Sequence, residues 1–131
     1  MLALDTNTLV YFFKGMGRVA ERLLATPRSE IGIPAVVVYE IESGIARLSE
    51  PDKRRAQFEL LLASVMILPF DRKAAHHAAL VRSGLEAQGR PIGPMDTLIA
   101  GTALACAATL VTRNRREFSR VPGLHLVDWY D

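Results

Sequence analysis

The chain has 131 residues, half of them hydrophobic, and this predicts one domain over residues 1–131 with a substantial core. The formal net charge of +2 is compatible with an anionic partner but does not require one. The single cysteine excludes a disulfide framework and a cysteine-ligated zinc site, and no apolar run reaches the length of a membrane span. We therefore expect a soluble, unexported, cytoplasmic protein that does not associate with membranes.

Short apolar runs predict the strands. They lie at residues 2–4, 31–33, 65–70, 109–111 and 124–127. A continuous apolar run is typical of a strand buried on both faces, as in a parallel sheet. In the third run, Pro69 has to lie at the end of the strand, because proline cannot donate a hydrogen bond to the ladder.

Helical patterns separate these strands. They cover residues 9–13, 19–25, 36–48, 52–65, 74–88 and 95–107. Thr6 or Asn7 is the expected cap of the first helix, and Leu48 is expected on the apolar face of the third. Alternating strands and helices predict an α/β fold in which helices cover both faces of a mostly parallel sheet of four to five strands.

Oxygen-bearing side chains follow several of these strands. Asp5 directly follows the first strand, and Glu40 lies in the helix after the second. Asp96 opens the helix after a Gly-Pro pair, and Asn114 and Glu117 come just after the fourth strand. Ligands of open α/β sheets bind at the carboxyl ends of the strands, so we expect these side chains to meet at one edge.

A cluster of carboxylates implies a cation, because the negative charges otherwise raise one another's pKa. Oxygen ligands suit Mg²⁺, with Mn²⁺ as a substitute, better than zinc. Such an ion can activate a water and stabilise the leaving oxygen of a phosphodiester. The pattern therefore favours hydrolysis of nucleic acid.

Each of these residues also has a structural interpretation. Asp5 could cap the first helix, Glu40 could be a solvated helix carboxylate, and Asp96 could be a partner of the helix dipole. Asn114 is expected to form structural hydrogen bonds more than to bind metal directly. On position alone, capping and metal binding remain equally open for Asp5.

Basic residues cluster beside the last of these positions. Arg113, Arg115 and Arg116 are suited to contacts with RNA backbone phosphates near a cleavage site. A solvated surface, or a contact for an acidic partner segment, is an equal alternative.

Four segments of the chain together resemble the PIN-domain ribonucleases, specifically the VapC toxins of bacterial toxin–antitoxin pairs. They read LDTN at 4–7, YEIESG at 39–44, GRPIGPMDTLIAGTAL at 89–104 and VTRNRREFSRVPGL at 111–124. The resemblance covers nearly the whole chain and implies a three-layer PIN-like fold with an Mg²⁺-dependent endoribonuclease activity. It assigns Asp5, Glu40 and Asp96 as metal ligands. Asn114 falls on the fourth acidic position of the family, which leaves Glu117 as a possible substitute.

The resemblance also implies partners. They are a VapB-like antitoxin in a hetero-oligomer, a second copy of the chain in a homodimer, and an RNA substrate. The stretch QGRPIGPMD is similar to the VapC branch that cuts initiator tRNA in the anticodon loop, so tRNA is the expected substrate.

Two alternative functions start from the same residues. The opening DTNTL is close to the D-x-D-x-T pattern of haloacid-dehalogenase-like phosphatases, with Asp5 as nucleophile, but Asn7 stands where that pattern has its acid/base. A catalytically silent PIN-like binding module is the other alternative, and the three carboxylates in matching segments argue against it.

Overall fold

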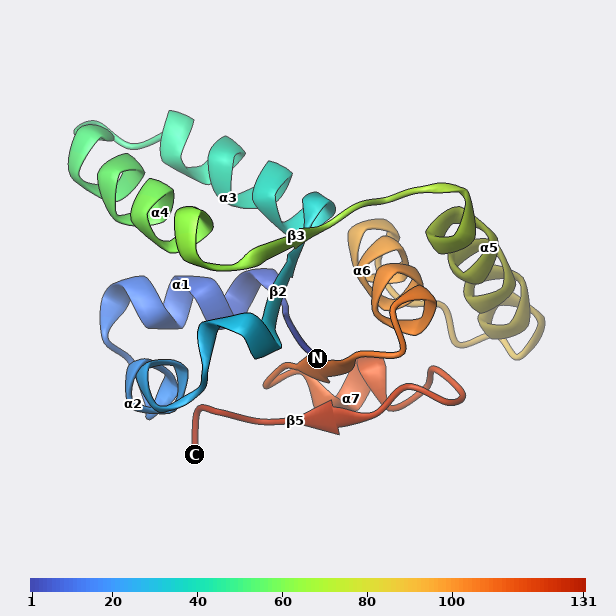
Figure 1. Cartoon of the computed structure of the whole chain (residues 1–131). Helices are drawn as coiled ribbons and strands as arrows, with labels where there is room; N and C mark the ends of the chain where they lie inside the picture. The colour runs from blue at the N-terminus through green and yellow to red at the C-terminus, as the bar shows by residue number, and fades with distance from the viewer.

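Five short parallel strands form the centre of the computed structural model, which describes all of residues 1–131 (Figure 1). The strands are β1 (Leu2–Leu4), β2 (Ile31–Pro34), β3 (Met66–Leu68), β4 (Thr109–Val111) and β5 (Leu126–Val127). They pair in the order β3-β2-β1-β4-β5, and every pair is parallel. The predicted α/β class with a parallel sheet is confirmed.

Helices cover both faces of this sheet. They are α1 (Thr6–Lys14), α2 (Val19–Ala25), α3 (Ala35–Ala46), α4 (Asp52–Ser64), α5 (Arg72–Ala87), α6 (Pro94–Ala105) and α7 (Arg115–Phe118), with a 3₁₀ turn at Arg28–Glu30. The crossovers from β1 to β3 place α1 to α4 on one side, and the return crossover from β3 to β4 places α5 and α6 on the other (Figure 1). No helix combines the length and the apolarity needed to cross a membrane.

The core lies between the sheet and the two helical layers. Strand residues Leu4, Ile33 and Leu110 are fully buried, as a parallel sheet covered on both faces requires. The α5–α6 pair packs very closely at Gly101, where an added Cβ would lie 2.6 Å from the Cβ of Ala78. The small residues of α6 therefore allow two helices to approach almost backbone to backbone.

The outer strands differ from the sequence prediction. The third strand spans Met66–Leu68 instead of 65–70, and the prediction that it is buried is wrong for Met66 and Ile67, which are exposed. This strand lies at the edge of the sheet, and the consecutive side chains of Met66 and Ile67 point to opposite faces. At this edge the helices therefore leave both side chains exposed. The fifth strand is reduced to two residues, and Leu48 lies beyond the end of α3 and is 46% exposed, so its expected place on the apolar helix face is wrong.

Candidate functional site

The candidate site lies where β1 and β4 run side by side at the centre of the sheet. From this pair the chain order diverges, since β2 and β3 extend the sheet one way and β5 the other. Such a switch point leaves a crevice at the carboxyl ends of the two strands. Asp5 stands directly after β1 and Thr112 directly after β4, and the Asp5 N–H donates to the carbonyl of Val111 at 3.2 Å.

Asp5 is a buried carboxylate, with only 4% of the residue exposed. Its Oδ1 accepts a hydrogen bond from the Thr8 N–H at 2.8 Å, so Asp5 itself is the N-cap of α1 and the expectation of Thr6 or Asn7 as cap is wrong. Burial raises the pKa of Asp5, and the charge of Glu40 raises it further, whereas hydrogen bonds from Thr112 and Thr8 lower it. Capping and participation in the charged cluster thus coexist in one side chain.

Glu40 extends from α3 toward the same place. The Thr6 hydroxyl, on the first turn of α1, donates to Glu40 Oε1 at 2.6 Å. This hydrogen bond links two elements that are distant in sequence and restricts the orientation of the carboxylate. Glu42, two residues later, is instead paired with Arg55 at 2.7 Å, so the two acids of α3 serve different surroundings.

Asp96, in the first turn of α6, has a strongly perturbed pKa. Partial burial and the neighbouring charges of Glu117, Asp5 and Glu40 raise the pKa of Asp96 to about 6. An acid shifted by three other acids must lie within electrostatic reach of all of them. Asp5, Glu40 and Glu117 therefore all lie within electrostatic reach of Asp96.

Asn114 holds Glu117 in place. It is the N-cap of α7: its Oδ1 accepts from the Glu117 N–H at 3.4 Å and its Nδ2 donates to Glu117 Oε2 at 3.3 Å. The Asn114 N–H in turn donates to the Thr112 hydroxyl oxygen at 3.0 Å. Asn114 is thus seen in the hydrogen-bonding role expected of it, while the fourth carboxylate is contributed by Glu117 three residues later.

The predicted basic residues lie beside this cluster without neutralising it. Arg113, Arg115 and Arg116 are exposed, and none of them forms an ion pair. The guanidinium of Arg113 instead stacks on Tyr130. The four clustered carboxylates also lack any ion pair with a Lys or Arg side chain, so their negative charge is not balanced within the chain.

The donor set suits a hard divalent cation that keeps part of its water shell. All donors are oxygens, which is the chemistry that Mg²⁺ and Mn²⁺ require. No three His, Cys, Asp or Glu side chains converge closely enough to hold one ion together. Mg²⁺ commonly binds through only one or two carboxylates plus waters and substrate oxygens, so this arrangement fits such an ion without a closed protein cage.

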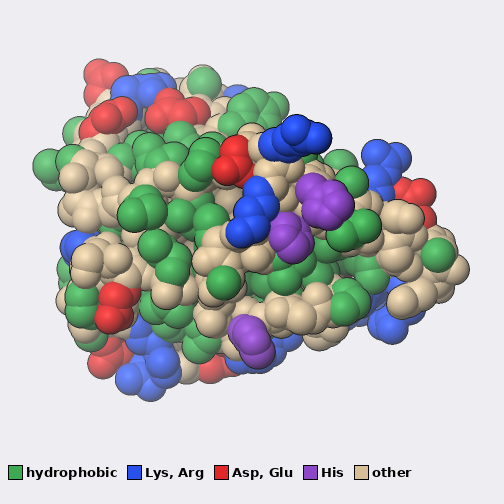
Figure 2. Space-filling view, turned by 45° about the vertical axis from the view of Figure 1, so that its right-hand side comes forward, with side chains coloured by type: hydrophobic (Ala, Val, Ile, Leu, Met, Phe, Trp, Pro, Cys, Tyr) green, Lys and Arg blue, Asp and Glu red, His purple; other side chains and the backbone are tan.

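Other surface features do not compete for this role. An open groove of about 800 Å³ between α5 and α6 is lined mainly by apolar residues and includes none of the four carboxylates. The space-filling view with α5 and α6 turned forward shows hydrophobic side chains together with histidines, Lys or Arg side chains and an acidic group near the centre, while the other acidic groups lie toward the margins (Figure 2). Asn7 lies in the first turn of α1 as an amide where the phosphatase pattern needs an acid/base, so that alternative is not favoured.

Comparisons with known proteins agree with this geometry. The family model described as PIN domain matches residues 2–124. The tRNA(fMet)-specific endonuclease VapC of Shigella flexneri is 33% identical over 126 residues, with 96% of each chain covered. Ribonuclease VapC2 of Rickettsia felis is 34% identical over 128 residues, again with 96% of each chain covered.

Solved structures show the same fold. The VapBC complex of Salmonella typhimurium bound to DNA contains a chain with a TM-score of 0.91 and 32% identity, covering 98% of this chain and 97% of that one. In VapBC2 from Rickettsia felis bound to a promoter DNA fragment, the TM-score is 0.90 at 32% identity and 98% coverage of both chains. The chain belongs to the PIN-domain family. Its relatives within that family are VapC ribonucleases.

Proposed function

We propose that this chain is a divalent-metal-dependent endoribonuclease and the toxin of a VapBC-type toxin–antitoxin pair. The observation that carries the proposal is the meeting of Asp5, Glu40, Asp96 and Glu117 at the carboxyl ends of β1 and β4, with a perturbed pKa at Asp96. The ribonuclease relatives, similar along almost the whole chain, support the same activity. A silent binding module would have no reason to maintain four mutually repelling acids.

The residues of the site have two proposed roles, binding the metal and orienting the carboxylates that bind it. Asp5 and Asp96 are the proposed direct ligands, while Thr6 orients Glu40 and Asn114 orients Glu117 for direct or water-mediated contact. When bound, Mg²⁺, or Mn²⁺ in its place, supplies a water of lowered pKa and stabilises the charge that develops on the phosphodiester. The Thr8 N–H fixes the Asp5 carboxylate as the cap of the first helix, and the nearby Thr112 hydroxyl also lowers the pKa of Asp5.

We further propose tRNA as the substrate class, with initiator tRNA as the first candidate. The relatives from Shigella flexneri and Salmonella typhimurium are both named tRNA(fMet)-specific endonucleases and are 33% and 32% identical to this chain. A single-stranded loop, such as the anticodon loop, exposes the backbone to a crevice of this kind better than a duplex does.

The proposed protein partner is a VapB-like antitoxin. Three similar solved structures are VapBC complexes, at 30–32% identity. A basic antitoxin side chain entering the acidic crevice would provide the counter-charge that the chain itself lacks. The homodimer expected from the resemblance stays a prediction, which sedimentation of the purified chain tests.

The decisive experiment compares variants of two acids on α3 and one after β1. The purified chain is incubated with total tRNA and Mg²⁺, or with EDTA, and the products are mapped by their cleavage ends. We expect Asp5→Asn and Glu40→Gln to lose cleavage while Glu42→Gln, which only breaks the pair with Arg55, keeps it. Undiminished cutting by Asp5→Asn, or full activity in EDTA, overturns the proposal.

A further inference from the structure

Arg113 lies between Thr112 and Asn114 in the connection after β4, and its side chain packs on aromatic residues. Its guanidinium carbon lies 3.5 Å from the centre of the Tyr130 ring, and Tyr11, whose ring packs edge-on against Tyr130, lies close to its side chain. The residue is nevertheless exposed and forms no ion pair with any acid of the chain. Arg113 is therefore a positive charge whose orientation is set by aromatic residues and whose remaining donors face solvent.

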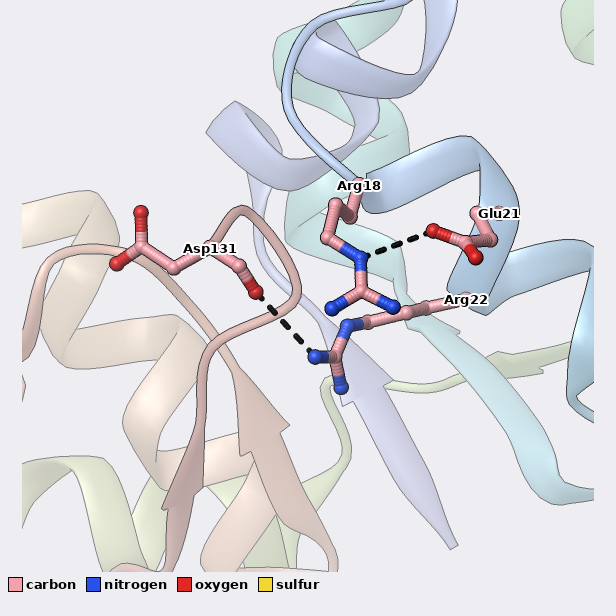
Figure 3. A network of polar contacts seen from close by, with 4 residues as sticks. All are labelled: Arg18, Glu21, Arg22 and Asp131. Carbon is pink, nitrogen blue, oxygen red and sulfur yellow. Dashed lines mark hydrogen bonds and ion pairs between the residues drawn. The ribbon is translucent and has the colours of Figure 1, made fainter.

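The ring under Arg113 is itself firmly anchored. Tyr130 packs edge-on against Tyr11 with ring centres 5.0 Å apart, its N–H donates to Asp128 Oδ1 at 2.7 Å, and its carbonyl accepts from the Arg18 N–H at 2.9 Å. Arg22 donates to the carbonyl of Asp131 at 3.3 Å, which ties the following residue to α2 (Figure 3).

The turn between α1 and α2 is shaped to receive this ring. Gly17 has φ of +61°, and a Cβ added there would lie 2.7 Å from both the Tyr130 ring and the Tyr130 carbonyl oxygen. A side chain at this position would therefore force the ring away from Tyr11. The absence of a Cβ allows the C-terminal segment to lie directly against the turn.

The same short connection carries both the site and this cation. The Thr112 hydroxyl lowers the pKa of Asp5, Asn114 orients Glu117, and Arg113 stands between them. Tyr11, the other aromatic neighbour of Arg113, lies six residues beyond Asp5 along α1, which is a rise of about 9 Å. The guanidinium is thus placed to meet a group adjacent to the reacting phosphodiester and not the reacting phosphodiester itself.

A guanidinium stacked on a ring keeps its edge N–H groups free, and these match the oxygens of a phosphate in a bidentate arrangement. Cation–π stacking on Tyr130, with Tyr11 beside it, reduces the rotamer freedom that an exposed arginine otherwise loses on binding. Arg115 and Arg116 have no such support. Among the three candidate arginines, Arg113 is the one already held in one orientation.

We propose that Arg113 binds the RNA phosphate next to the one that is cut, and that Tyr130 is a positioning residue that holds it there. This inference rests on the proposed ribonuclease function. It assigns the C-terminal segment a part in substrate binding, although that segment contributes none of the clustered acids.

The test separates binding from chemistry. The probe is a stem–loop RNA with the sequence of the initiator-tRNA anticodon arm. Steady-state cleavage with Mg²⁺ compares Arg113→Gln, Tyr130→Leu, Tyr130→Phe and the Arg113→Gln/Tyr130→Leu double variant. The matched control is Arg54→Gln, which removes a charge from the other cation–π pair, where Arg54 lies 4.9 Å from the centre of the Phe13 ring. RNA binding is measured in parallel at several salt concentrations on the non-cleaving Asp5→Asn background.

We expect Arg113→Gln to raise KM by about tenfold with little change in kcat, and to reduce the slope of log affinity against log salt by about 0.7. Tyr130→Leu raises KM in the same direction but adds nothing in the Arg113→Gln background, whereas Tyr130→Phe and Arg54→Gln stay near the unchanged chain.

Three results would overturn the inference: an unchanged salt slope in Arg113→Gln, an equal KM effect of Tyr130→Leu with or without Arg113, or a purely kcat effect. If the chain without substitutions binds this RNA with the expected Arg113 dependence but cuts no RNA, the proposed function is refuted, while the contact of Arg113 with an RNA phosphate stands.

Discussion

The replacement of Asp96 by asparagine tests whether the clustered acids repel one another in the folded chain. The pKa of Asp96 is raised from 3.8 to about 6 by partial burial and by the charges of Glu117, Asp5 and Glu40. Because the folded pKa lies above the unfolded one, the folded state holds the proton more tightly. The cost of ionising Asp96 is absent below about pH 4, grows between about pH 4 and 6, and is complete above that range.

The size of this cost follows from the shift. Two pKa units correspond to roughly 3 kcal/mol if the group were fully shielded from solvent. Asp96 is only partly buried, so solvent screening reduces the figure to about 1–2 kcal/mol. Asparagine also gives up a favourable first-turn interaction with the helix dipole, which costs about 0.5 kcal/mol. We therefore expect Asp96→Asn to be more stable by about 1 kcal/mol above pH 7.

The assay is thermal unfolding in EDTA at pH 8 and at pH 4. For a domain of this size, about 1 kcal/mol corresponds to a rise in Tm of roughly 3–5 °C at pH 8, and the gain should vanish at pH 4. Glu42→Gln is the control, because it removes the same formal charge outside the cluster. A variant no more stable than the unchanged chain at pH 8, or equally stabilised at both pH values, refutes the repulsion argument.

Changes at other positions separate the chemistry of the site from the packing that supports it. Asp5→Asn keeps an oxygen for the cap of α1, so unfolding changes by less than about 1 kcal/mol while single-turnover cleavage falls roughly a hundredfold or more. Gly101→Ala lowers stability to urea by about 1–3 kcal/mol, because its Cβ meets Ala78; an unchanged midpoint contradicts that packing. Added Mg²⁺ should raise the Tm of the unchanged chain and raise that of Asp96→Asn less; equal shifts in calorimetry exclude Asp96 as a ligand.

The central strands could be predicted because each is a short run of consecutive apolar residues, which is typical of a strand buried on both faces. The runs at 2–4 and 109–111 match β1 and β4, which have neighbours on both edges and helices on both faces. At 65–70 the same kind of run predicted a buried strand, which is wrong for Met66 and Ile67. An apolar pattern does not tell a central strand from an edge strand, and the exposure of Met66 and Ile67 depends on which strand pairs beside them.

The site was predictable to the extent that topology alone positions it. Asp5 directly follows β1, so topology places it at the carboxyl edge of the sheet, whereas Glu40 in α3 and Asp96 in the first turn of α6 were singled out by the family resemblance. The place of Glu117 depends on α7, a single turn with no hydrophobic repeat, and on the cap that Asn114 forms there. Glu117 could be named from the sequence as the substitute for Asn114, and the local signal that supports its position is an asparagine followed three residues later by glutamate at a helix start, a variant of the capping box.

The stacking of Arg113 on Tyr130 lay outside any local pattern. The two residues belong to segments after β4 and after β5, and their contact depends on how the chain end returns to the α1–α2 turn at Gly17. No periodicity or capping rule connects such positions. Arg113 could therefore be selected from the sequence as a basic residue beside the site, but its distinction from Arg115 and Arg116 required the three-dimensional arrangement.

Asp5 shows why a buried charge can be kept at the centre of this fold. Burial raises its pKa, yet the Thr8 N–H and the Thr112 hydroxyl stabilise the ionised form, and the first of these bonds is also the cap that starts α1. The helix therefore offsets part of the cost of a carboxylate that the proposed chemistry needs. The electrostatic repulsion within the cluster appears at Asp96, because burial and the charges of the neighbouring acids raise its pKa. A cation at this edge would relieve that cost, so metal binding and folding stability should rise together.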